Sequence, residues 1–221
     1  MKKNALVLCL FLFSVLNNSL NAQLLRVGLK GGLNFSTMLE ASDFNTFSDV
    51  YKYNTGYNIG LAVSTPATSG VGGESGIYFN TRGYKINSGD DVNGVAGSVN
   101  TLWLEIPFKA TKSIELGPLT LFGSGGVSGS LGLSGSMNLD VTVLGVTTSS
   151  KDDIVWGTNP DDADLVRIDY GAVASVGLEF KSFVFELGYY YGLANLSPYT
   201  EDGYVISSRY FSISLGYLFG L

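Results

Sequence analysis

Histidine is absent from this sequence of 221 residues, and cysteine occurs once, at Cys9. Histidine is the side chain whose pKa best suits proton transfer near neutral pH, so its absence removes the usual general base of hydrolases and acyl-transferases. A single cysteine provides neither an intramolecular disulfide nor a thiolate metal site. We therefore predict that the protein is not an enzyme and holds no metal and no other cofactor.

Charged residues are also scarce, at 14% of the chain, and acidic residues outnumber basic ones, 19 to 13. Ordinary soluble domains carry about 25% charged residues. A nucleic-acid-binding protein needs a basic patch that neutralises phosphates, and this charge balance does not provide one. The sequence thus predicts no nucleic-acid partner.

No apolar segment is long enough to cross a membrane as a helix. The most apolar one, Ala5–Leu16, has about a dozen residues, whereas a spanning helix needs about 20. It follows two lysines and precedes a polar stretch that ends at Ala22, which is the three-part pattern of a secretory signal peptide. We predict a signal peptide over residues 1–22 and one domain over 23–221, with 11 basic against 19 acidic residues and a net charge of −8. A retained membrane anchor is the alternative.

Apolar residues in the rest of the chain alternate with small or polar ones. In the first such segment, Val27, Leu29 and Leu33 fall on one face, with Gly28 and Lys30 on the other. A period of two indicates β-strands, because successive side chains of a strand point to opposite faces, and a helical period of 3.6 fits none of the segments. The pattern predicts eight strands, at residues 26–37, 57–64, 74–84, 101–110, 119–134, 167–180, 182–192 and 210–219.

The lengths of the connections favour a membrane barrel over a soluble sheet. Those at 38–56, 85–100, 135–166 and 193–209 are long and polar, whereas the intervening ones at 65–73, 111–118 and 181–182 are shorter. Outer-membrane barrels have long external loops and short periplasmic turns. Aromatic residues at segment ends, where amphipathic rings sit at headgroup depth, agree with this. We predict an all-β, eight-stranded antiparallel up-and-down transmembrane β-barrel with both termini periplasmic. A soluble lipid-binding barrel is the non-membrane alternative.

The polar face carries isolated charges of both signs, which predict a charge network inside the barrel. An eight-stranded barrel is just wide enough for side chains to fill it, so we interpret these residues as a structural plug of the lumen. The alternative is a path for ions or small solutes. The network comprises Lys30, Glu74, Arg82, Glu105, Lys109, Glu179 and Glu186.

Three further motifs have structural interpretations. Pro107 lacks an N–H and should mark a bulge or a strand end near the periplasmic rim. The aspartates between Asp152 and Asp164 could bind a cation, but their spacing does not match an EF-hand, and a solvated external loop is the favoured interpretation. A glycine cluster has no helical segment after it, as a phosphate-binding loop would need, and is expected to let bulky lumenal side chains approach the backbone. This glycine cluster comprises Gly123, Gly125, Gly126, Gly129 and Gly132.

Three stretches carry a resemblance to a known family: 27–35 (VGLKGGLNF), 104–109 (LEIPFK) and 214–219 (SLGYLF), of which 104–109 is the most specific. On these stretches the chain, from residue 24 onward, resembles the PorT-like outer-membrane β-barrel family of Bacteroidota. The chain departs from the usual pattern at its end, where Gly220-Leu221 follows the aromatic Phe219. The resemblance implies an outer-membrane location, and it implies little about activity, although a few members are tied to protein secretion.

Together these observations predict a monomeric barrel of the bacterial outer membrane, surrounded by lipid, with a structural, adhesion or scaffold role carried by its long external loops. The resemblance motivates one alternative, an accessory component of a protein-secretion or envelope-assembly machine with other envelope or secretion proteins as partners. A small-solute channel is the other alternative.

Overall fold

The computed structural model describes residues 25–42, 51–65, 71–89 and 93–220. The predicted signal peptide, residues 1–22, lies outside these ranges. The described chain is all-β, and one short 3-10 helix, η3 (Glu201–Gly203), precedes the last strand. The strands are β1 (Arg26–Ala41), β2 (Tyr51–Thr65), β3 (Gly72–Gly89), β4 (Gly94–Leu116), β5 (Leu119–Val143), β6 (Val146–Asp153), β7 (Ile168–Phe180), β8 (Phe183–Gly192) and β9 (Val205–Gly220). None of the described helical segments is long and apolar enough to span a membrane.

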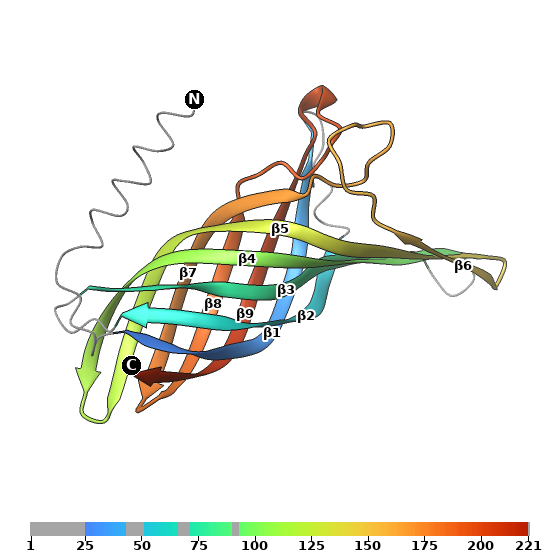
Figure 1. Cartoon of the computed structure of the whole chain (residues 1–221). Coiled ribbons are helices and arrows are strands. Elements are labelled where there is room, and N and C mark those ends of the chain that lie inside the picture. The colour runs from blue at the N-terminus through green and yellow to red at the C-terminus, as the bar shows by residue number, and fades with distance from the viewer. Residues whose placement is uncertain (1–24, 43–50, 66–70, 90–92, 221) are drawn as a thin grey trace, which may run out of the picture.

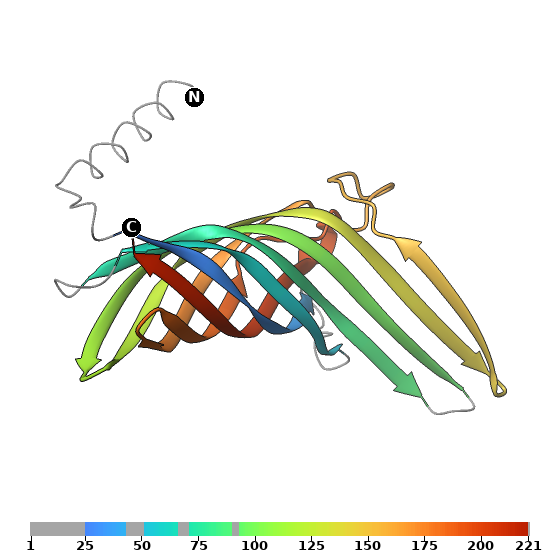
Figure 2. The same cartoon turned by 60° about the horizontal axis from the view of Figure 1, so that its bottom comes forward.

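Eight of the nine strands close into a ring in which every neighbour is antiparallel (Figure 1). Consecutive strands of the ring pair in sequence order, β4 pairs with β5, and β5 continues to β7. Pairing of β1 with β9 closes the ring, so that Arg26 lies opposite Gly220 and both ends of the described chain meet at one end of the barrel (Figure 2). Closure leaves no unpaired edge in the ring, which confirms the predicted antiparallel up-and-down architecture.

The predicted number of strands is wrong by one, because β6 lies within the stretch predicted to be the loop 135–166. β5 runs on to Val143, turns through Leu144 and Gly145, and returns as β6, which pairs with β5 alone. Both turn residues have positive φ, 51° and 75°, as a two-residue hairpin turn of type I′ requires. The additional strand therefore belongs to a hairpin outside the ring.

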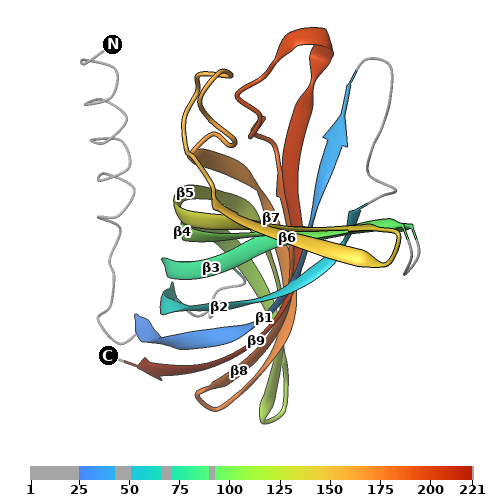
Figure 3. The ribbon, with the colours of Figure 1, turned by 90° about the vertical axis from the view of Figure 1, so that its right-hand side faces the viewer.

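Strands β3, β4 and β5 are much longer than the ring requires, with 18, 23 and 25 residues. Their distal parts leave the ring together and, with β6, form a sheet that extends to one side of the barrel (Figure 3). The predicted long loop at 85–100 is consequently mostly strand, since β3 ends at Gly89 and β4 begins at Gly94. We call this part, residues 84–89, 94–100 and 135–153, the protruding sheet.

The two ends of the barrel differ. The hairpin end carries the two-residue turns at Gly117-Pro118 and Lys181-Ser182 and both ends of the described chain. Gly117 and Lys181 have positive φ, 66° and 56°, as such tight turns demand. The other end, here called the loop end, carries the protruding sheet and the segments 154–167 and 193–204. The sequence thus places its long connections on one side of the ring.

Side chains of the ring alternate between an apolar outer face and a polar inner face. Leu29, Ile59, Val176 and Leu215 are 58%, 52%, 57% and 67% exposed, and Leu104 is half-buried. The residues that alternate with these along the strands point inward, and the buried polar ones among them are mostly asparagine, serine, lysine and glutamate. A soluble barrel would reverse this arrangement and bury its apolar face. The outer surface is therefore built to face hydrocarbon.

Pro107 lies in the middle of β4 and not at a strand end, which corrects the prediction for this residue. It pairs with Ser128 of β5. On the β3 side, the pairing is interrupted between the pairs Ser75–Phe108 and Tyr78–Glu105. The missing N–H of proline accounts for a gap on the β3 side only. The irregularity in the β4–β5 register lies elsewhere, between Leu102 and Trp103.

Candidate functional site

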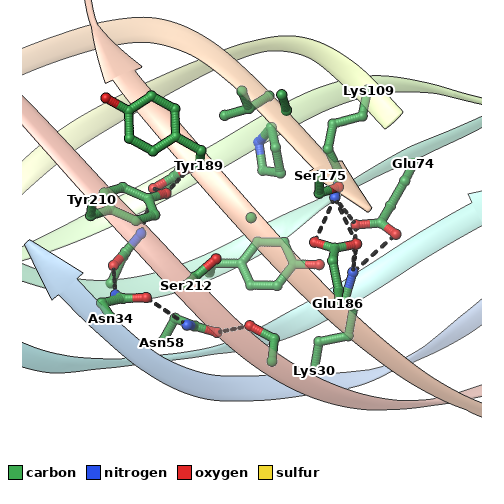
Figure 4. Close-up of a pocket in the computed structure, with 18 residues that line it drawn as sticks. Lys30, Asn34, Asn58, Glu74, Lys109, Ser175, Glu186, Tyr189, Tyr210 and Ser212 are labelled. Atoms are coloured by element: carbon green, nitrogen blue, oxygen red, sulfur yellow. Dashed lines mark hydrogen bonds and ion pairs between the residues drawn. The ribbon is translucent and has the colours of Figure 1, made fainter. Parts of the chain in front are cut away.

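The lumen near the hairpin end holds two lysines and two glutamates that alternate around a closed circuit (Figure 4). The Nζ atom of Lys30 lies 2.9 Å from a carboxylate oxygen of Glu74 and 2.9 Å from one of Glu186. The Nζ atom of Lys109 lies 2.8 Å and 3.0 Å from oxygens of the same two carboxylates. These four residues, here called the four-charge cluster, come from β1, β3, β4 and β8, so they link opposite walls of the barrel.

A second group of charges centres on Arg82 of β3, which is fully buried. One Nη atom of its guanidinium donates to Asp169 at 2.7 Å, and the other donates to Glu105 and, at 2.9 Å, to the hydroxyl of Ser130. No other lysine or arginine of the described chain forms an ion pair with these two carboxylates. Arg82 is thus a single cation that serves two buried anions.

Three aromatic rings surround this guanidinium. The Arg82 Cζ atom lies 4.4 Å from the ring centroid of Tyr190, 5.0 Å from that of Tyr210 and 5.3 Å from that of Trp103. Tyr190 and Tyr210 stack on each other at 5.0 Å, and the Tyr210 hydroxyl donates to Glu105 at 2.9 Å. Cation–π contacts of a desolvated arginine add to its ion pairs, so the group is held by both.

Asparagine side chains fill the space between the two groups of charges. Asn58 Nδ2 donates to Asn34 Oδ1 at 2.7 Å, and Asn34 in turn donates to Asn80. Asn80 Nδ2 donates to Glu105 at 2.6 Å, while the Ser214 hydroxyl donates to Asn58 at 3.1 Å. Buried amides of this kind must be paired to avoid a desolvation penalty, and here they connect β1, β2, β3 and β4.

The seven residues of the predicted network thus fall into three places. Six of them belong to the two groups above. Glu179 does not join either; it forms an ion pair with Arg26 at the hairpin end. Asp169, Tyr190 and Tyr210 complete the Arg82 group, although sequence reasoning left them out of the network. The alternation of each strand could have identified them, because each of the three occupies an inward position of its alternating segment.

Apolar layers cover the polar lumen at both ends. At the hairpin end, Ala62, Phe122, Val184 and Leu218 form a buried cluster against which Tyr78 packs. At the loop end a second buried cluster, here called the cap, contains Met38, Val99, Trp103, Ile154, Leu165, Ala194 and Leu196.

Segments beyond the ring supply much of the cap. Ile154 and Leu165 come from the connection between β6 and β7, and Leu196 comes from the one between β8 and β9. The ring of Trp156 meets that of Trp103 edge-on at 5.1 Å. The cap therefore fastens the loop-end segments onto the barrel wall.

A cavity of about 70 Å³ lies within the polar lumen and is lined by the four-charge cluster and by Glu105 and Tyr210 of the Arg82 group. It has room for a few water molecules. The aspartates at 152–164 do not converge in the same way. Asp164 accepts from the Val155 N–H, Asp162 accepts from Asn159, and the described residues contain no group of three or more potential metal ligands.

The sequence profile described as the outer membrane protein beta-barrel domain matches residues 21–197. The chain belongs to this family. Membership of the outer membrane protein β-barrel domain family places the chain in the outer membrane and agrees with its closed ring and its apolar outer face. The narrower PorT-like resemblance stays a prediction.

Three solved bacterial surface or outer-membrane proteins match this chain at low sequence identity and low TM-score. The attachment invasion locus protein Ail of Yersinia pestis, crystallised with the heparin analogue sucrose octasulfate, is 14% identical, with 88% of this chain and 99% of Ail covered and a TM-score of 0.39. OprG of Pseudomonas aeruginosa is 11% identical, with 90% and 98% covered and a TM-score of 0.40. Neisserial surface protein A is 11% identical, with 88% and 97% covered and a TM-score of 0.39. No curated protein matches the chain.

Proposed function

We propose that the protein is a non-conducting, non-enzymatic barrel that displays its protruding sheet outside the cell as an attachment or scaffold surface. One observation carries this proposal: the sheet leaves the closed ring and ends at β6, which among the described strands pairs only with β5 and has eight exposed residues. An open strand edge is a ready template for main-chain pairing with another protein. The barrel then serves as the membrane anchor of that surface.

The contrast between the two ends of the barrel supports the orientation. The two-residue turns that join neighbouring strands of the ring, Gly117-Pro118 and Lys181-Ser182, lie at the hairpin end together with both ends of the described chain, and the protruding sheet lies at the other end. Outer-membrane barrels carry short turns in the periplasm and long segments outside. We accordingly assign the hairpin end to the periplasm and the loop end to the cell exterior.

The contents of the lumen support the absence of conduction. The two groups of charges, the asparagines between them and the two apolar layers occupy the interior along its length. A water-filled channel needs a wider ring than eight strands provide. Reconstitution in planar lipid bilayers tests this: we expect no resolvable single-channel steps, and steady steps of uniform size would support a small-solute channel instead.

Photo-crosslinking in living cells tests the display surface. A photoreactive amino acid at Thr148, in the middle of β6, is compared with the same amino acid at Ser182, in a turn of the hairpin end. We expect protein adducts from Thr148 that are absent from Ser182. Adducts with other envelope proteins would indicate a scaffold role in an envelope machine, and adducts with foreign proteins would indicate attachment. Adducts that form from neither position, or only from Ser182, would contradict the proposal.

A further inference from the structure

The outer wall of the barrel carries a shallow groove of about 700 Å³ that crosses β4, β5, β7, β8 and β9. Its floor consists of glycine and alanine, whereas the neighbouring wall carries large side chains. Ala110, Gly125 and Ala174 are direct partners in one cross-strand row, which ends on the rings of Tyr189 and Phe211. Four inter-strand steps of about 4.8 Å give this row a length of ~19 Å. We call this depression the outer-wall groove.

A second row borders the first and brings a positive charge to one end of the groove. Lys112 of β4 is the direct partner of Gly123, which pairs in turn with Val176 and then Leu187. All four residues lie on the outward face and are exposed. The groove is thus an apolar trough with a lysine at its β4 end.

The backbone of the barrel does not require the glycines of this floor. A Cβ atom at Gly123 or Gly125 would meet no neighbour closer than 4.0 Å or 3.8 Å, and neither residue has a positive φ. Gly126 is different, because a Cβ there would lie 1.9 Å from the carbonyl oxygen of Phe108. The expectation that the whole cluster admits lumenal neighbours is therefore wrong for the outward members. Their missing side chains leave space that nothing in the described chain fills.

Lys112 is out of place on a wall that faces hydrocarbon. Along β4 its outward neighbours are Ala110 on one side and Ile114, 61% exposed, and Leu116, 56% exposed, on the other. Within the described residues it has neither an ion pair nor a hydrogen bond. A lysine on the lipid face of a barrel is costly unless its ammonium reaches the headgroup level or pairs with an anion.

We propose that the outer-wall groove binds one phospholipid. Its phosphate pairs with the Lys112 ammonium, and one of its two acyl chains lies across Gly123 and Gly125 against the Tyr189 ring. Lys112 precedes the turn residue Gly117 by five positions, so its long side chain can carry the ammonium, and the phosphate paired with it, to the headgroup level of the nearer leaflet. The groove matches both parts of this ligand, because Lys112 provides one cation for one phosphate and the apolar trough accommodates one acyl chain. The proposal rests on the membrane placement of the outer face and goes beyond the display function.

Native mass spectrometry of the folded protein, titrated with phosphatidylglycerol from detergent micelles, tests the chain-binding floor. Gly125→Leu fills the trough, and Gly129→Leu is the matched control, because Gly129 is also outward, lies outside the groove and has no atom within 4 Å of its Cβ position. We expect one bound lipid for the parent protein and for Gly129→Leu, and at least tenfold weaker binding for Gly125→Leu. Equal binding by the two leucine variants would overturn the proposal.

Lys112→Gln tests the phosphate contact, and it keeps the test decisive if Gly125→Leu does not fold, since it changes an exposed side chain. We expect at least tenfold weaker binding of phosphatidylglycerol and unchanged binding of uncharged diacylglycerol. Unchanged phosphatidylglycerol binding would mean that Lys112 merely reaches water, and displacement of the lipid by inorganic phosphate would reduce the groove to an anion site. Either result overturns the proposal, and neither alters the crosslinking expected from Thr148.

Discussion

Replacement of Arg82 by methionine removes the one cation that serves two buried carboxylates. The guanidinium is fully buried, and the side chains of Glu105 and Asp169 are 5% and 0% exposed. Methionine has a similar length and no charge, so Arg82→Met leaves both anions inside the barrel without a cation, and Glu105 keeps only neutral donors such as Asn80 and Tyr210. Removal of one member of a buried ion pair typically costs about 3–5 kcal/mol. Because two buried anions lose their ion pair here, we expect a loss at the upper end of that range.

Lys30→Met is the matched comparison, since Lys30 is also buried, at 3% exposed, but its two carboxylates have a second cation, Lys109. Glu74 and Glu186 each keep their contact with Lys109, at 2.8 Å and 3.0 Å. The loss is then closer to that of hydrogen bonds to a charged group, about 1.5–3 kcal/mol. A difference of about 2 kcal/mol between the two variants corresponds to roughly 30-fold in the unfolding equilibrium constant.

Urea unfolding from phospholipid vesicles measures both variants, with fluorescence of Trp103 and Trp156 as the signal. The triple variant Arg82→Met, Glu105→Gln, Asp169→Asn tests the reason for the loss, because it removes the uncompensated anions together with the cation. We expect it to recover much of the lost stability. Equal stability of the two single variants, or no recovery in the triple one, would refute the electrostatic explanation.

Two further predictions concern packing. Gly126→Ala should abolish the heat-modifiable band that folded barrels give on SDS gels, because the new Cβ would lie 1.9 Å from the Phe108 carbonyl oxygen. The control Gly129→Ala should fold like the parent protein, and a normal band for Gly126→Ala would contradict the prediction. Trp156→Ala should loosen the cap and raise the quenching of Trp103 fluorescence by iodide at least twofold, whereas unchanged quenching would mean that the loop-end segments do not shield Trp103.

The closed ring and its two faces could be predicted from sequence because strand geometry fixes them. Once a segment alternates, the side of each residue follows, and Leu29 and Lys30 must point in opposite directions. A membrane makes the pattern clearer, since the outward residues must be apolar along the whole span. This constraint ends where the strands leave the lipid.

The hairpin of β5 and β6 was missed for that reason. Outside the membrane neither face has to be apolar, and the β6 sequence VTTSSKDD alternates only in part. Its turn is also inconspicuous, because Leu144 takes a positive φ that usually belongs to glycine or asparagine. Polar strands that continue a membrane strand look like loops in the sequence.

The partners within the lumen were beyond prediction because strand phase gives only the set of inward residues. Which of them meet depends on the stagger of strands around the ring and on contacts across it. Lys30 and Glu186 are 156 residues apart and lie on strands that β9 separates, yet their charged atoms are 2.9 Å apart. Glu179, inward on the same strand as Asp169, sits too near the hairpin end to reach Arg82 and pairs with Arg26.

Labelling of single cysteines tests most directly whether the apolar face meets lipid, since Cys9, in the predicted signal peptide, is the sole native cysteine. Cysteine is placed at Leu29, Ile59 or Leu215 on the outer face and at Asn34 or Ser128 in the lumen, and the folded protein in bilayers is treated with a lipid-soluble or a water-soluble maleimide. We predict that outer-face positions react only with the lipid-soluble reagent and that lumenal positions react with neither. Rapid labelling of the outer-face positions by the water-soluble reagent would contradict the membrane barrel.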